Sequence, residues 1–291
     1  LINPASTVIE TGDVRNYKVM DQTNSSPMGF PDFSPELPNA IRSWVGSFKT
    51  NTGSIWGLTS ISGSLALQLG RQELIERELN QAFDNQSNSN EVTRLLNNLS
   101  IKYISTDYDL TSGAYDRVFD SASNNVVIYK NNTAKPKFRL YSKFQTVKSY
   151  QGSFDALKLL DEDVLIIECN QDCPIYDDAP VSTADNTNFK LINSSSTFYE
   201  IGVDAKQAGW LFVSDAYYTG WNAYINDTAV PLFPAQVLGK ALHFPAGQSI
   251  VKISYEPRSF YIGALLTGLG LTILIAYYSL HYVTRRQQRF K

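Results

Sequence analysis

An uncharged apolar segment near the end of the chain constrains the fold more than any other feature. Residues 260–283 contain no Asp, Glu, Lys or Arg and are rich in Leu, Ile, Ala, Gly and Tyr. As a helix rising about 1.5 Å per residue, such a segment spans roughly 36 Å, enough to cross a bilayer with some tilt. The alternative is a buried helix of a soluble fold, where uncharged stretches of this length are rare. We therefore expect a transmembrane helix over residues 259–284.

Basic residues on one side of this segment predict its direction in the membrane. Three arginines and a lysine lie in the tail 285–291, whereas the other flank carries Glu256 and Arg258. Basic residues are enriched in the cytoplasmic flanks of spanning helices. We therefore expect a protein of the cell membrane, with a basic cytoplasmic tail and with the residues before about Ser259 outside the cytoplasm.

Small residues in the segment indicate that the helix packs against others. Ala264 and Gly268 lie four residues apart, and such pairs allow helices in a membrane to approach closely. The chain also opens at Leu1 with a sequence typical of the interior of a longer protein. Both observations favour a polytopic parent protein whose other transmembrane helices are partners of this one.

The composition describes a globular domain outside the membrane. Apolar residues make up 43% of the 291 residues and charged residues 18%, with a net charge of −3. This charge gives no basic surface of the kind that phosphate backbones require, so we expect no nucleic-acid partner.

Periodicity predicts an α+β fold in which the outer part has two subdomains. The first, residues 1–136, combines helices and strands, and the second, residues 137–258, has short strands about every ten residues, separated by Gly, Pro, Asn and Asp. Regular spacing of this kind is typical of a jelly-roll-like β-sandwich. In the mixed subdomain we expect helices at 64–83 and 91–99 and strands at 17–20, 101–105 and 126–130. After it we expect strands at 138–144, 164–168, 189–192, 198–203, 209–214, 222–225, 230–233, 241–244 and 250–255, with a helix at 153–160.

The cysteines and histidines restrict the chemistry. Cys169 and Cys173 lie four residues apart, so they form either a small loop disulfide in an oxidising space or two free thiols. His243 lies in a strand and His281 at the end of the spanning helix, so they cannot meet. We therefore expect no metal site and no cofactor in this chain.

The densest aromatic passage, residues 214–226, supplies the first candidate binding residues. Gly220 allows a sharp turn that leaves Tyr218 and Trp221 beside Asp215. Aromatic faces next to a carboxylate are how proteins hold sugars. The alternative is that Trp221 fills the core and Tyr218 bonds to the backbone at a corner. We predict a core position for Trp221 and a surface position for Asp215.

A second candidate passage, residues 51–63, places small residues around one tryptophan before a helix. Asn51 and Trp56 are its candidate binding residues, because backbone amides at a helix start accept anions such as phosphate. The passage lacks the lysine that follows the glycines of a phosphate-binding loop. The alternative is therefore a loop with a purely structural role.

Taken in order, several segments resemble the C-terminal part of the bacterial YfhO family of polytopic membrane proteins, regarded as glycosyltransferases of the GT-C type. The resemblance covers most of the chain and is strongest after Gly209, where the sequence Tyr-Glu-Pro-Arg-Ser-Phe leads into the spanning helix. One departure is Thr219, where the family usually has Pro before Gly-Trp. The matching stretches are 51–63, 95–104, 127–131, 135–138, 211–225, 231–235, 244–247 and 255–260.

The resemblance implies a membrane glycosyltransferase that uses a lipid-phosphate-linked sugar, such as a polyprenyl-phosphate sugar, to modify a surface glycan acceptor. It places the catalytic acid on an early outer loop that this sequence does not contain, so no catalytic residue is assigned here. Whether that upstream part holds a divalent metal stays open. The alternative function is a non-catalytic membrane-anchored ectodomain that binds sugar or mediates adhesion.

Overall fold

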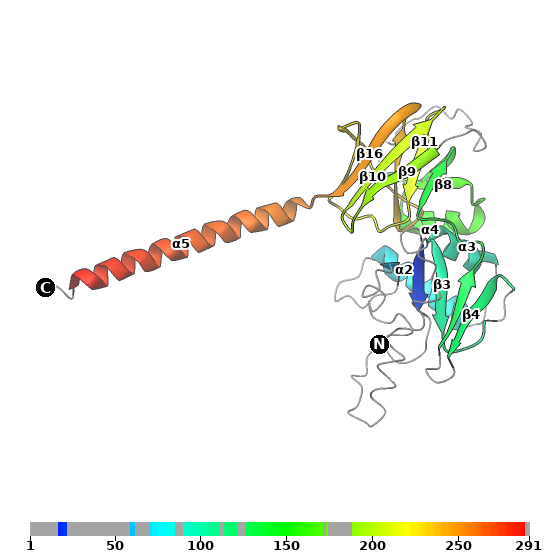
Figure 1. Ribbon diagram of the computed structural model, residues 1–291, viewed down its shortest axis with the longest axis horizontal. Coiled ribbons are helices and arrows are strands. Elements are labelled where there is room, and N and C mark those ends of the chain that lie inside the picture. Colours follow the sequence, from blue (N-terminus) through cyan, green and yellow to red (C-terminus); the bar gives the residue numbers. More distant parts are fainter. Residues whose placement is uncertain are drawn as a thin grey trace, which may run out of the picture.

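The described residues form three β-sheets, packed helices and one long C-terminal helix, α5 (Figure 1). This α+β class is the one predicted from the sequence. The computed structural model describes residues 17–21, 59–61, 70–84, 90–110, 113–121, 126–170, 173 and 188–288.

The first sheet is mixed, in the order β2-β1-β3-β5-β4. Strand β1 runs parallel to both of its neighbours, and the remaining pairs are antiparallel. Helices α2 and α3 share a hydrophobic core with this sheet, to which Leu79, Leu96 and Ile104 contribute. The elements are β1 (Lys18–Asp21), β2 (Thr59–Ser60), α2 (Gly70–Asp84), α3 (Asn90–Asn98), β3 (Ile101–Thr106), β4 (Tyr115–Ser121) and β5 (Val126–Asn131).

The other two sheets form the sandwich. One has the order β6-β11-β15-β14-β8-β7 and is antiparallel except for β7 beside β8, and the other has the antiparallel order β13-β12-β16-β10-β9. The strands are β6 (Phe138–Tyr141), β7 (Lys143–Val147), β8 (Val164–Glu168), β9 (Asn188–Ser194), β10 (Phe198–Ala205), β11 (Gly209–Val213), β12 (Trp221–Ile225), β13 (Thr228–Val230), β14 (Phe233–Ala235), β15 (Gly239–Phe244) and β16 (Gly247–Tyr255).

Alternation along the strands builds the sandwich core. In β16, Val251 and Ile253 are fully buried while Lys252 between them is partly exposed, and Ile201 of the paired strand β10 is also fully buried. These side chains join Leu211 of the facing sheet in one hydrophobic core. Side chains on a strand point alternately to opposite faces, so the period-two pattern of the sequence is enough to choose the buried face.

Helix α4 (Tyr150–Leu159) ties the two parts of the domain together. Its Phe154 and Leu157 belong to the same hydrophobic core as α2 and α3. In addition, Arg71 of α2 donates to both carboxylate oxygens of Glu168, at the end of β8, at 3.1 Å each. The boundary that we predict at residue 136 therefore divides the sheets but not the hydrophobic core.

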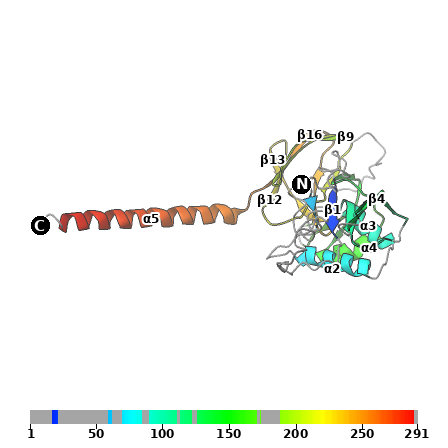
Figure 2. The ribbon, with the colours of Figure 1, turned by 60° about the horizontal axis from the view of Figure 1, so that its bottom comes forward.

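Helix α5 (Arg258–Gln288) leaves the sandwich as a single helix and stays clear of it in both views (Figures 1 and 2). Its segment Arg258–Ser279 is long and apolar enough to cross a membrane. Large apolar side chains along it are exposed, among them Leu265 at 70% and Ile275 at 67%. Water solvates such a surface poorly, so this helix suits association with a membrane.

Several element boundaries differ from the prediction. Strand β4 was not predicted, because Asp116, Arg117 and Asp120 interrupt its apolar pattern and it lies at the edge of its sheet, where charged side chains reach water. The strand expected at 138–144 is two strands, β6 and β7, at opposite edges of one sheet. The run expected at 230–233 is likewise divided between β13 and β14.

Candidate functional site

The candidate site is built around the loop that joins β11 to β12. Two backbone carbonyls of this loop, those of Asp215 and Ala216, accept hydrogen bonds from Nζ of Lys240, at 3.2 Å each. The amide of Tyr217 donates to the carbonyl of Leu238 at 2.7 Å. Residues just before and within β15 therefore fix the position of the loop.

Three lysines that are far apart in the sequence converge on Asp215. Lys137, just before β6, forms an ion pair with Oδ2 of Asp215 at 3.4 Å, and Lys18 of β1 donates to Oγ of the neighbouring Ser214 at 3.4 Å. Lys18, Lys137 and Lys240 are 5%, 8% and 0% exposed. We call these three residues the lysine cluster. It joins the first sheet to the sandwich.

Aromatic rings close the cluster on the side of the sandwich core. The hydroxyl of Tyr199 donates a hydrogen bond to Oδ2 of Asp215 and accepts one from Lys137 at 2.9 Å. The indole of Trp221 stacks on the Tyr199 ring, with centroids 5.9 Å apart and an interplanar angle of 9°. Nζ of Lys240 lies 3.7 Å from the centroid of Trp221, a cation–π contact.

Electrostatics in the cluster follow from burial and charge. Burial alone would raise the pKa of Asp215, but the three lysines hold it well below its usual value. Burial lowers the pKa of Lys18 to about 7 and that of Lys240 to about 8, against the opposing effect of Asp215. Burial and the neighbouring carboxylate raise the pKa of Tyr199, so its hydroxyl keeps its proton.

The structure brings together some of the predicted site residues. Trp221 is half-buried and packs against the sandwich core, which agrees in part with its predicted core position. Asp215 differs from the predicted surface position, because its side chain is only 25% exposed and is paired with Lys137 and Tyr199. Tyr218 is 51% exposed on the loop. The candidates Asn51 and Trp56 lie outside the described residues.

The lysines of the cluster were missed in the sequence. Lys18 comes from the first sheet, and no local pattern shows that it meets residues of the sandwich. Lys240 carries a weak signal, because a lysine stands in the largely apolar strand Gly239–Phe244. A charged residue in a strand that reads as buried indicates either an edge position or a buried ion pair.

The loop is also bonded to the joint that leads into α5. The amide of Glu256 donates to the carbonyl of Gly220 at 2.7 Å, and the rings of Trp221 and Tyr255 lie 5.4 Å apart. Gly220 has φ +114°, and a Cβ there would lie 3.2 Å from Cα of Pro257. The candidate site therefore adjoins the start of the apolar helix.

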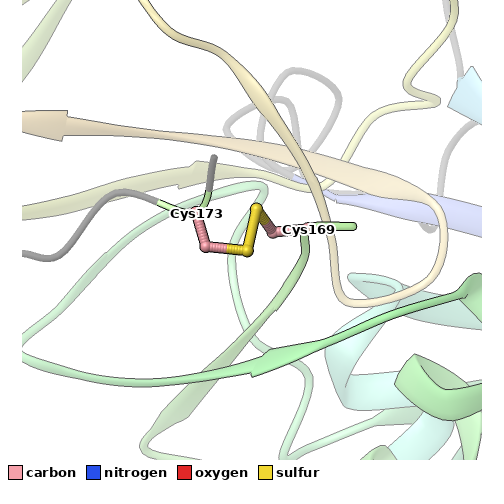
Figure 3. Close-up of a disulfide and its surroundings, with 2 residues drawn as sticks. All are labelled: Cys169 and Cys173. Carbon is pink, nitrogen blue, oxygen red and sulfur yellow. A yellow bond between two sulfur atoms is a disulfide. The ribbon is translucent and has the colours of Figure 1, made fainter. Parts of the chain in front are cut away.

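The cysteines are joined elsewhere in the sandwich. Cys169 follows β8 and forms a disulfide with Cys173, their Cα atoms 5.6 Å apart (Figure 3). The amide of Cys169 donates to the carbonyl of Val147 at 2.8 Å. Among the described residues, no group of three or more His, Cys, Asp or Glu side chains is placed to hold a metal ion.

Comparison of the chain with known protein families, with curated proteins and with solved structures found no match. The chemistry of the lysine cluster and its place beside α5 are therefore the starting point for the function.

Proposed function

We propose that this chain is the C-terminal outer domain and last membrane span of a polytopic glycosyltransferase of the GT-C type, similar to the YfhO family. In this proposal the parent enzyme transfers a sugar from a lipid-phosphate-linked donor to a cell-surface glycan. The observation that carries the proposal is the hydrogen bond from Glu256 to Gly220, which fixes the loop of Asp215 and Trp221 to the start of α5.

A lipid-linked donor presents its sugar and phosphate at the membrane surface, because its hydrocarbon chain stays in the bilayer. With α5 in the membrane, the loop lies next to the point where the helix enters it. Tyr218 is exposed there, and Asp215 is partly accessible. Rings beside a carboxylate suit a sugar, which offers C–H faces to the rings and hydroxyls to the acid.

The same proposal assigns the remaining features of the chain. Residues before about Ser259 lie outside the cytoplasm, where the disulfide of Cys169 and Cys173 is stable. Ala264 and Gly268 face other spanning helices of the parent protein. The catalytic acid belongs to an upstream outer loop, so this chain positions the donor or acceptor and transfers no sugar by itself.

A second candidate function is a membrane-anchored ectodomain that binds sugar without catalysis. It is favoured by a groove of about 410 Å³ on the sheet of β9, β10 and β16. Phe189, Ile192 and Ile250 line this groove and are 39%, 51% and 38% exposed. Polar side chains surround them, including Asp204 and Gln248, a combination that also suits a glycan.

Two exposed aromatic residues separate these functions. The gene of the parent protein is deleted and then restored as wild type, as Tyr218→Ala or as Phe189→Ala, and the surface glycans are analysed by mass spectrometry. We expect the deletion to remove one glycan modification, Phe189→Ala to restore it fully and Tyr218→Ala to restore it poorly, with equal amounts of protein in the membrane. Unchanged glycans in the deletion strain would refute the transferase. If Phe189→Ala abolished binding of the protein to a glycan while Tyr218→Ala did not, the result would support the ectodomain.

A further inference from the structure

The lysine cluster holds more positive charge than the described residues balance. Arg139, two residues after Lys137 on β6, is 7% exposed and adds a fourth cation beside Lys18. Among the described residues, Asp215 is the only carboxylate that forms an ion pair with a lysine of the cluster. Glu162, which acts on Arg139 from a distance, is itself paired with Lys135 at 2.6 Å. Buried charges are costly unless they are paired, so four basic side chains around one carboxylate are unusual, and burial already lowers the pKa of Lys18 to about 7.

Several donors in this region also have unused capacity. Within the part of the chain that the structure describes, Nζ of Lys18 has one long hydrogen bond, at 3.4 Å to Ser214, although an ammonium group offers three donors. Nε of Arg139 and Oγ of Ser100 are buried and have no hydrogen-bond partner among the described residues. These groups are linked, because Arg139 donates to the carbonyl of Asn98, which also accepts from Ser214.

The chemistry of the missing partner follows from these two observations. A group with several acceptor oxygens and negative charge would satisfy the free donors and balance the cations together. Phosphate has this combination, and charge-assisted hydrogen bonds from lysine and arginine are the strong ones. Asp215 does not fill that role, since Tyr199 and Lys137 already occupy its Oδ2.

The cluster comes nearest to solvent on one side. The side chains of Lys137 and Asp215 are 11% and 25% exposed, whereas Lys240 is fully buried. That side adjoins the loop that is bonded to the start of α5. A phosphate group at the membrane surface would therefore approach from the side on which these two residues are exposed.

We propose that the lysine cluster and Arg139 form a binding site for a phosphate group, which is either the head group of a lipid-linked sugar or free phosphate. The phosphate site stands on the charge balance and the free donors alone. The lipid as its source rests on the proposed function. Lys137 lies on the side nearest to solvent, Lys18 and Arg139 behind it supply the free donors, and Lys240 holds the loop in place.

The test uses the full chain in detergent micelles, titrated calorimetrically with inorganic phosphate and, separately, with a short-chain prenyl phosphate. We expect Lys18→Met to weaken phosphate binding about tenfold or more, because one charge-assisted contact is lost. Lys18→Arg, which keeps the charge, should retain most of the affinity. The control is Lys252→Met, a lysine on the outer face of β16 that pairs with Asp227.

Each outcome bears on the proposal. Saturable binding of phosphate that Lys18→Met weakens and Lys252→Met does not would support the site, and tighter binding of prenyl phosphate would identify a lipid source. Equal affinities for the two would favour free phosphate. Absence of binding by folded wild-type chain, or equal binding by Lys18→Met, would overturn the site. If Lys18→Met does not fold, Arg139→Lys, which removes the unpaired Nε, replaces it. Phosphate binding with unchanged glycans in the deletion strain would refute the proposed function and leave the site standing.

Discussion

Trp221 connects the sandwich core to the lysine cluster through its ring contacts. It stacks on Tyr199, lies against Tyr255 and receives Nζ of Lys240 over its ring. Trp221→Ala would remove all three contacts and leave Lys240 with the more distant ring of Tyr199, 5.9 Å from its Nζ. Because the indole is half-buried, we expect a loss of about 2–3 kcal/mol of unfolding free energy, somewhat below the range for a fully buried tryptophan.

The measurement is thermal unfolding of the full chain in detergent, followed by near-ultraviolet circular dichroism. The melting temperature should fall by about 5–10 °C. Tyr218→Ala, on the same loop but 51% exposed, is the matched control and should change the unfolding free energy by less than about 0.5 kcal/mol. Equal melting temperatures for wild type and Trp221→Ala would contradict the structural role of the indole.

The cluster also predicts how stability depends on pH. Burial lowers the pKa of Lys18 to about 7 and that of Lys240 to about 8, whereas an unfolded lysine has a pKa near 10.5. Between these values the unfolded chain binds more protons than the folded chain, so the unfolding free energy rises with pH. Asp215 stays ionised and Tyr199 stays protonated between pH 7 and 9, since the pKa of the first is lowered and that of the second is raised.

We expect the unfolding free energy, measured by urea denaturation, to increase from pH 7 to pH 9. Each lysine contributes at most about 1.4 kcal/mol per pH unit to this slope. Lys18→Met should reduce the slope, because the variant lacks one of the two groups that titrate. A slope that is flat in wild type, or unchanged in Lys18→Met, would show that Lys18 is not held at a lowered pKa.

At the scale of elements, the joint between the sandwich and α5 depends on a single glycine. Gly220 has φ +114°, a backbone angle that residues other than glycine rarely adopt. A Cβ at this position would lie 3.2 Å from Cα of Pro257. We expect Gly220→Ala to lower the unfolding free energy by about 1–3 kcal/mol. Gly113→Ala is the control, since nothing lies within 4 Å of its added Cβ and its φ is not in the left-handed region. Equal stability of the two variants in thermal unfolding would contradict a strained joint.

The sequence predicts elements well where burial is one-sided and regular. Burial alternates along strand β16 from Gln248 to Ser254, and residues 260–283 of α5 carry no charged side chain, so both elements were located to within a few residues. Edge strand β4 was missed because its charged residues interrupt the alternation of apolar and polar residues that is typical of a strand. The disulfide pairing of Cys169 with Cys173 is present in the structure and was one of two alternatives, because four residues of separation allow a bond without requiring it.

The site could be predicted only in part, for a physical reason. Asp215 and Trp221 are neighbours in sequence, so their proximity follows from a local turn. Lys18 on β1 and Lys137 just before β6 are distant in the sequence, and their meeting with Asp215 depends on strand order, which local periodicity does not encode. The strand order, and therefore the lysine cluster, could be identified only in the structure.

At the scale of the whole molecule, the proposed function requires the sandwich to lie on one particular side of the membrane. The proposed lipid-linked sugar donor for surface glycans and the oxidised Cys169–Cys173 pair both require the sandwich to lie outside the cytoplasm. The predicted orientation comes from the arginines in the tail 285–291, opposite the flank with Glu256.

The most direct test is a fusion reporter that is active only in the cytoplasm, placed after Lys291 in one fusion and after Pro257 in another. With equal amounts of both fusions in the membrane fraction, the account predicts activity after Lys291 and none after Pro257. Activity after Pro257, alone or together with activity after Lys291, would place the sandwich in the cytoplasm and contradict the account.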